Sequence, residues 1–272
     1  MTATAFTSGG IAYDRTGPTG RRPVVLLHAG IADRRMWDPL WPKLTAQRDV
    51  VRLDLRGFGE SVGRPDGELS PVDDLRGLLS ELDLGACHLV GASFGAGVAV
   101  EFALTDPDRV TSLLLSAPGG SLIAQVTPEL EMFIAAEAAA LDKGDVEQAA
   151  DVNVRWWVDG PHRDERTVDS TVRDAVRQMQ QRAFELTADW DDVDEAELDP
   201  PAVDRLADLR VPTLVLTGGL DLDAIGDAAH RILDEAPNVR GVTWPDVAHL
   251  PSMERPDDFY TLLTDWLQEV EG

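Results

Sequence analysis

The sequence predicts an α/β protein with a mostly parallel, doubly wound sheet, because apolar runs of strand length alternate with helical patterns along the chain. The alternation stops after about Gly119 and resumes after Leu209. We therefore expect a core made of residues 1–118 and 210–272, with residues 119–209 inserted as an all-helical cap, or lid. A chain of 272 residues with 43% hydrophobic content is long enough to bury such a core.

The elements expected before the insertion begin with a hairpin. Residues Ala5 to Tyr13 contain the sequence Ser8-Gly9-Gly10, which is typical of a turn between two short strands. Beyond it, short apolar runs predict buried strands and longer patterns predict helices, joined by right-handed crossovers. In chain order these are a strand at Val24–Leu27, a helix at Met36–Leu44, a strand at Val50–Leu53, a helix at Val72–Leu82, a strand at Cys87–Val90, a helix at Phe94–Thr105 and a strand at Val110–Leu115.

The insertion carries helical patterns and no convincing strand. These patterns cover Glu129–Leu141, Val146–Val158 and Val168–Leu186, and an acidic stretch closed by prolines follows from Asp189 to Pro201. After it, the sequence predicts a strand at Thr213–Leu216, a helix near Asp227–Glu235, a strand at Val239–Trp244 and a last helix at Asp257–Val270. Because the α/β order continues on both sides of the helical block, we expect the block to lie over the sheet as a lid.

The excess of acidic residues limits the kinds of molecule that the protein is expected to bind. The chain has 24 Lys and Arg against 49 Asp and Glu, a formal net charge of −25. Nucleic acids and anionic membranes require a positive protein surface, so we expect neither as a partner. The same field slows the approach of multiply anionic substrates.

Cysteine content and the N-terminal residues indicate a compartment. Cys87 is the only cysteine, which excludes an intramolecular disulfide, and its strand pattern favours a small buried hydrophobe over a reactive thiol. The residues Met1 to Ala5 lack the basic and apolar regions of a signal peptide, and no apolar run approaches the roughly 18 residues that span a bilayer. We expect a cytoplasmic monomer or homodimer.

The pentapeptide Gly91-Ala92-Ser93-Phe94-Gly95 is the most informative feature, because it separates a strand pattern from a helix pattern. A serine at a sharp strand-to-helix turn is held in a strained backbone, so its close neighbours must be very small. This geometry exposes the hydroxyl above the sheet. It also leaves the Phe94 amide at a helix N-terminus, where it can stabilise an oxyanion. Ser93 is therefore the candidate nucleophile.

A nucleophilic serine needs a base, and His249 is the best candidate among the five histidines. His249 lies in a loop that follows a short strand and precedes the last helix, where α/β folds place catalytic groups. We expect structural or solvent-facing positions for three other histidines. His88 lies in the strand before Ser93, His162 in a charged loop of the cap, and His230 in a predicted helix.

The acid that orients the base is expected just after the preceding strand. Thr217-Gly218-Gly219-Leu220-Asp221 places Asp221 at the tip of a glycine-rich turn, and Asp223 is the alternative two residues further on. We favour Asp221 because the loop tip is nearer the sheet edge than the start of the next helix. Serine, acid and histidine then follow in the order Ser93, Asp221, His249, which is the order expected of one hydrolase class.

Motifs over nearly the whole chain outside the cap carry a resemblance. They are Leu26-Leu27-His28-Ala29-Gly30, the turn from Asp54 to Ser61, the elbow at Ser93, Gly218 to Asp221, and Ala248-His249-Leu250-Pro251 with Glu254-Arg255-Pro256. Together they resemble the α/β-hydrolase superfamily, of the single-domain serine hydrolase type with a helical cap. One departure is Ala29, where the family usually has glycine, and a methyl group is tolerated there if φ stays negative.

The resemblance implies roles for the residues that match the family's motifs. His28 would be structural, and Gly30 would donate its amide to the oxyanion hole beside that of Phe94. The turn from Asp54 to Ser61 would support the fold. A serine at position 93 argues against the haloalkane dehalogenases and epoxide hydrolases, which resemble this fold but attack through a carboxylate.

The expected chemistry is acyl transfer to water, with no metal and no organic cofactor. Small to medium neutral esters or lactones are the expected substrates, since the pattern is similar to small-molecule esterases and enol-lactonases. Carbon-carbon bond hydrolases of ring-cleavage products and non-catalytic ligand-binding members of the fold are the alternatives. Large apolar cap residues could line an acyl pocket, although packing within the cap is the competing role; they are Phe133, Trp156 and Trp157, with Met132, Met179 and Phe184.

Overall fold

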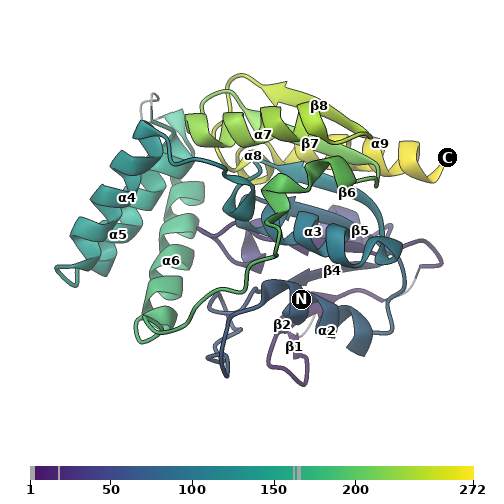
Figure 1. Ribbon diagram of the computed structural model, residues 1–272, viewed down its shortest axis with the longest axis horizontal. Helices are drawn as coiled ribbons and strands as arrows, with labels where there is room; N and C mark the ends of the chain where they lie inside the picture. Colours follow the sequence, from purple (N-terminus) through teal and green to yellow (C-terminus); the bar gives the residue numbers. More distant parts are fainter. Residues whose placement is uncertain (1–3, 18, 162, 164–166) are drawn as a thin grey trace.

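The computed structural model describes residues 4–17, 19–161, 163 and 167–272, and these residues form one eight-stranded sheet flanked by helices (Figure 1). The strand order is β1-β2-β4-β3-β5-β6-β7-β8. The first strands, β1 and β2, pair antiparallel as the predicted hairpin, and β2 is antiparallel to β4, whereas all further pairs are parallel. The strands are β1 (Ala5–Phe6), β2 (Ala12–Arg15), β3 (Val24–Leu27), β4 (Val50–Leu53), β5 (Cys87–Ala92), β6 (Val110–Ser116), β7 (Thr213–Gly218) and β8 (Val239–Trp244).

Helices cover both faces of the sheet, which confirms the doubly wound prediction. The α-helices of the described residues, including those that do not cover the sheet, are α1 (Trp41–Thr45), α2 (Pro71–Glu81), α3 (Phe94–Thr105), α4 (Pro128–Leu141), α5 (Val146–Asn153), α6 (Ser170–Thr187), α7 (Asp223–Glu235), α8 (Pro251–Glu254) and α9 (Pro256–Glu271). Side chains alternate along each strand, so Val24 and Leu26 belong to one buried hydrophobic cluster, which includes residues of α1 and α9, while Val25 and Leu27 belong to a second one, which includes residues of α2 and α3.

Three helices between β6 and β7 stand apart from the sheet. In Figure 1, α4, α5 and α6 lie side by side at the left of the molecule, and the chain then runs back past α3 to reach β7. The assignment of residues 119–209 as a separate cap domain stays a prediction. No helix among the described residues is both long and apolar enough to cross a bilayer.

Two predicted helices differ from the structure. The helix expected at Met36–Leu44 is instead a 3₁₀ turn at Arg34–Trp37 followed by the short α1. Pro39 lies between them, and a proline supplies no N–H with which a helix could continue through this position. The pattern at Val146–Val158 is α5 followed by a π-helical turn at Val154–Asp159. Such turns are rare and frequently occur at functional sites.

Candidate active site

Ser93 occupies the sharp turn between β5 and α3 in a strained conformation. Its backbone has φ 50° and ψ −113°, outside the regions that a residue with a side chain ordinarily adopts. The turn is held because the Ser93 amide donates to the carbonyl oxygen of Ser116 at 2.9 Å, and the Ser93 carbonyl oxygen accepts from the amides of Ala96 at 2.8 Å and Gly119 at 3.2 Å. The side chain of Ser93 is half-buried.

Glycine is required on both sides of this serine. A Cβ added to Gly91 would lie 2.3 Å from the carbonyl oxygen of Gly95. A Cβ added to Gly95 would lie 2.5 Å from the carbonyl oxygen of His28. The close approach of β5, α3 and the loop after β3 therefore leaves no room for any side chain at these two positions.

His249 and Asp221 form a buried hydrogen-bonded pair at the same edge of the sheet as Ser93. Nδ1 of His249 lies 2.7 Å from Oδ2 of Asp221, and the two side chains are 1% and 3% exposed. A carboxylate can only accept, so Nδ1 carries the proton and Nε2 is left as the acceptor. His249 lies in the loop between β8 and α8, and Asp221 in the loop between β7 and α7.

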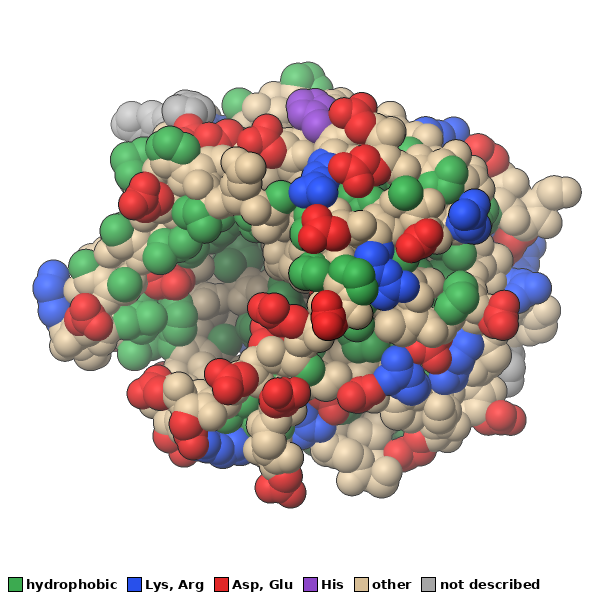
Figure 2. All heavy atoms as spheres, viewed as in Figure 1, with side chains coloured by type: hydrophobic (Ala, Val, Ile, Leu, Met, Phe, Trp, Pro, Cys, Tyr) green, Lys and Arg blue, Asp and Glu red, His purple; other side chains and the backbone are tan. Residues whose placement is uncertain are grey.

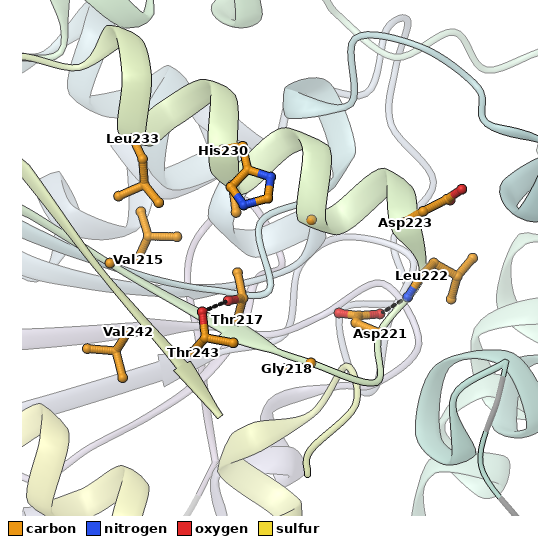
Figure 3. A pocket seen from close by; sticks show the side chains of 14 residues that line it. Val215, Thr217, Gly218, Asp221, Leu222, Asp223, His230, Leu233, Val242 and Thr243 are labelled. Carbon is orange, nitrogen blue, oxygen red and sulfur yellow. Dashed lines mark hydrogen bonds between the residues drawn. The ribbon is translucent and has the colours of Figure 1, made fainter. Parts of the chain in front are cut away.

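The alternative acid, Asp223, has different partners. Asp223 begins α7, and its carboxylate accepts from the Thr127 hydroxyl at 2.5 Å and from the Ala224 amide at 2.8 Å. The other oxygen of Asp221 accepts from the Leu222 amide at 2.8 Å. Figure 3 shows that the carboxylate of Asp223 points away from that of Asp221. The His249 side chain is therefore paired with Asp221, the residue favoured from the sequence.

The loop after β3 lies against the start of α3. A Cβ on Gly30 would be 3.5 Å from the Cβ of Phe94, and the Gly95 amide donates to the His28 carbonyl oxygen at 3.1 Å. As the first residue of α3, Phe94 has an amide with no carbonyl acceptor inside the helix. The structure thus brings together the two residues predicted to form an oxyanion hole.

Ala29, the departure from the family pattern, fits this loop without strain. The non-glycine residues with positive φ in the described part of the chain are Asp83, Ser93 and Ala117, so Ala29 has a negative φ. The Ala29 amide donates to the sulfur of Met36 at 3.3 Å, which fixes the loop from inside. Sequence reasoning did not find this support, because a thioether acceptor has no recognisable spacing.

His28 has both ring nitrogens occupied. Nε2 accepts from the Leu55 amide at 2.9 Å, so Nδ1 is protonated and donates to the Ala29 carbonyl oxygen at 2.9 Å. Burial lowers the pKa of His28, which keeps the ring neutral. The ring therefore supports the loop and cannot accept a further proton.

The turn from Asp54 to Ser61 supports the segment that follows β3. The carboxylate of Asp54 accepts from the Arg34 amide and the Glu60 amide, both at 2.8 Å, and it is ion-paired with the Arg34 guanidinium. Gly59 has φ 52°, and a Cβ there would lie 2.2 Å from Asp54. The tight turn thus shields a buried carboxylate that fixes the start of the 3₁₀ turn after β3.

The remaining histidines lie elsewhere. His88 contacts the Ser112 hydroxyl at 2.8 Å and the Glu271 carboxylate at 3.3 Å, and burial lowers its pKa to about 4. His230 is exposed on α7 and lines a pocket of about 280 Å³ with Thr217 and Thr243 (Figure 3). His162 falls outside the described residues.

Three aromatic residues of the predicted cap, which are Phe133, Trp156 and Trp157, form a cluster that contacts His249. The Phe133 ring is 5.1 Å from that of Trp157 and 6.4 Å from that of Trp156, both edge-on. The ring centroids of Trp157 and His249 are 4.4 Å apart. Phe133 and Trp157 are both 7% exposed, and Trp156 is partly buried.

The other large cap residues have varied surroundings. Met132 is 55% exposed, Phe184 is half-buried, and the buried Met179 accepts a hydrogen bond from the Asp33 amide at 3.4 Å. Figure 2 shows the surface hollowed beside the helices α4 to α6, with hydrophobic side chains along that side of the hollow. Beside α3, a cavity of about 420 Å³ is lined by Phe94, Gly120 and Ile123, together with Glu101, Glu195 and Glu197.

A serine in a strained strand-to-helix turn, with a hydrogen-bonded histidine and aspartate in later loops of a doubly wound sheet, is the pattern expected of one class of hydrolases. The model of the Alpha/beta hydrolase family matches residues 24–262 of this chain. The chain therefore belongs to the alpha/beta hydrolase family.

Individual relatives agree with that assignment. The chain is 27% identical to the pimeloyl-[acyl-carrier protein] methyl ester esterase of Pectobacterium atrosepticum, over 91% of this chain and 94% of that protein. It is 26% identical to a thermophilic esterase from Thermogutta terrifontis, with a TM-score of 0.75 and both chains covered completely. A shorter match, 38% identical, covers 44% of this chain but only 33% of the dihydrolipoyllysine-residue acetyltransferase component of the acetoin cleaving system of Pseudomonas putida.

Proposed function

We propose that this protein is a serine hydrolase that cleaves carboxylic esters or lactones of small to medium neutral substrates. The observation that carries the proposal is the strained Ser93 together with the buried hydrogen bond between His249 and Asp221. A hydrolytic member of the family needs a nucleophile, a base and an orienting group, and these three residues supply the groups in the order expected for the class.

In the proposed mechanism, Nε2 of His249 takes the proton of Ser93 as its hydroxyl oxygen attacks the substrate carbonyl. The amides of Gly30 and Phe94 hold the oxyanion of the tetrahedral intermediate, each being worth about 10²- to 10³-fold in rate. His249 then protonates the leaving alcohol, and an acyl-Ser93 ester remains. Water, deprotonated by His249, attacks this ester; the bond to Ser93 breaks, His249 returns the proton to the Ser93 oxygen, and the acid is released. A lactone is a cyclic ester, so the same steps open its ring.

The electrostatics disfavour anionic substrates. The chain carries a formal net charge of −25, and the cavity beside Phe94 is lined by Glu101, Glu195 and Glu197. A negative field raises the local concentration of cations and neutral molecules relative to anions. The hydrophobic wall of the cap supplies contact for an uncharged acyl chain.

The test is Ser93→Ala, assayed with p-nitrophenyl esters from acetate to octanoate, simple lactones and a ring-cleavage dienoate. We expect normal folding and a loss of ester hydrolysis on the order of 10⁴-fold or more, because the residues of a triad act as a unit. A fluorophosphonate probe should label the wild-type protein and not the variant.

Other outcomes would contradict the proposal. Retention of a tenth of the wild-type turnover by Ser93→Ala excludes Ser93 as the nucleophile. Turnover of the dienoate without turnover of esters or lactones favours carbon-carbon bond hydrolysis. A wild-type protein that binds these compounds but is never labelled is a ligand-binding member of the fold.

A further inference from the structure

The π-helical turn of the cap is bonded directly to the loop that carries His249. The His249 amide donates to the carbonyl oxygen of Trp157 at 3.2 Å. The indole of Trp157 lies against the imidazole, with the centroids 4.4 Å apart. A Cβ on Gly160, which has φ 85°, would lie 2.3 Å from the Leu220 carbonyl oxygen. The π-helical turn, with Gly160 directly after it, therefore contacts both His249, the proposed base, and the loop that carries Asp221.

Arg163, in the same cap segment, joins the cap to this loop. On the cap side, Nε donates to the Asp159 carbonyl oxygen at 2.7 Å and Nη2 to the Val158 carbonyl oxygen at 2.9 Å. On the core side, Nη1 donates to the Asp246 carbonyl oxygen at 3.0 Å and Nη2 to the Glu254 carboxylate at 2.7 Å. All three nitrogens of the guanidinium are bonded, and four acceptors from two parts of the chain converge on it.

Glu254 continues the connection toward His249. One oxygen of its carboxylate faces Arg163, and the other accepts from the Ala248 amide at 2.9 Å. The side chains of Arg163 and Glu254 are only 11% and 10% exposed. Removing one partner of a buried ion pair leaves the other charge uncompensated, so loss of either residue disturbs the loop immediately before His249.

We propose that Arg163 and Glu254 are positioning residues for His249, holding the base in place through Ala248 and through the cap turn that carries Trp157. This inference rests on the proposed serine hydrolase function. A base that must take a proton from Ser93 tolerates little displacement, and a misplacement of about 1 Å can cost about 10²-fold in rate. The cap thereby contributes to the geometry of the reacting groups as well as covering them.

The variants Arg163→Met and Glu254→Gln test the proposal. We expect each to lower kcat by about 10²-fold while KM changes by less than about threefold, because neither altered side chain is itself a candidate contact for the acyl chain. Arg163→Lys should recover part of the loss, since an ammonium keeps the charge but cannot reach four acceptors. The double variant should be no worse than Arg163→Met, because the two residues act together.

The matched control is Arg177→Met, which removes a cap arginine of α6 that is ion-paired with Asp151 and Asp174. It should keep the wild-type kcat. A readout independent of activity is amide hydrogen exchange of the peptide covering residues 246–250, which should speed up in Arg163→Met and Glu254→Gln and stay unchanged in the control.

The outcomes separate this inference from the proposed function. A wild-type protein that neither hydrolyses esters nor reacts with a fluorophosphonate removes the proposed function and the positioning role with it. An active wild type whose two variants keep kcat within about threefold, at a temperature well below their Tm, overturns the positioning role alone. If Arg163→Met does not fold, Arg163→Lys and Glu254→Gln decide the question by the same criteria.

Discussion

Asp221 and Asp223 are only two residues apart, but their side chains have different hydrogen-bond partners. Asp221 lies at the loop tip and is bonded to the His249 ring, whereas Asp223 begins α7 and accepts from Thr127 at the base of the cap. A carboxylate that fixes Nδ1–H of the base keeps the correct tautomer and stabilises the imidazolium that forms. A carboxylate bonded to a hydroxyl at a helix start stabilises the fold only.

We therefore expect Asp221→Asn to lower kcat by roughly 10⁴-fold and Asp223→Asn to lower it by less than about threefold. The measurement is steady-state hydrolysis of one short p-nitrophenyl ester by both variants, with thermal melts to verify folding. The assignment is wrong if Asp223→Asn is the more damaging change.

At the scale of elements, the π-helical turn after α5 gives the neighbouring tryptophans different environments. It places the Trp157 ring over His249 and leaves Trp156 partly buried beside Phe133. A regular helical pattern predicts neither the extra residue of a π turn nor which ring the turn directs toward His249. The sequence thus identified the helix and its aromatic residues, but the direction of each side chain depends on the loop of His249, about 90 residues away.

Trp156→Ala should shift the preferred acyl length and keep kcat for a short ester, because an apolar pocket discriminates by about 1–3 kcal/mol per methylene. Trp157→Ala should lower kcat by about tenfold for every ester, since it removes a contact with the base. Profiles from acetate to octanoate distinguish the two. If both variants keep the parental profile and lose only thermal stability, both tryptophans are packing residues of the cap.

At the scale of the molecule, short local signatures were sufficient to predict the sheet and the candidate triad. The elbow around Ser93 and the loops of Asp221 and His249 follow predicted strands, and parallel strands bring their carboxyl ends to one edge. The support of the site was not predictable, because its contacts join distant residues. Arg163 reaches Glu254 across 91 residues, and no spacing rule connects an arginine in a cap loop with a glutamate before the last helix.

The acidic composition also makes stability depend on pH. Loss of hydration, with Glu101 and Glu197 nearby, raises the pKa of Glu195 to about 7. An unfolded glutamate titrates near 4.3, so between these values the folded chain keeps a proton that the unfolded chain has lost. The stability associated with this group is therefore complete at low pH and is lost as the pH rises through about 7.

Glu195→Gln should accordingly raise Tm by a larger amount at pH 8 than at pH 5. Thermal melts at the two pH values measure this difference, and Glu147→Gln, at an exposed position of α5, should show none. An equal gain at both values would mean that the charge of Glu195 does not destabilise the fold.

The positive φ of Ser93 implies that the residue proposed to react is also one that destabilises the fold. Such a conformation costs about 1–3 kcal/mol in a residue with a side chain, and glycine adopts it freely at an entropic cost of roughly 0.5–1 kcal/mol. We expect Ser93→Gly to melt above Ser93→Ala, which lacks the hydroxyl but keeps the strained Cβ. An equal or lower Tm would mean that the turn stores no strain. On this expectation, the more stable form of the turn lacks the hydroxyl that the proposed mechanism uses, so engineering that selects for melting temperature alone would select against the proposed nucleophile.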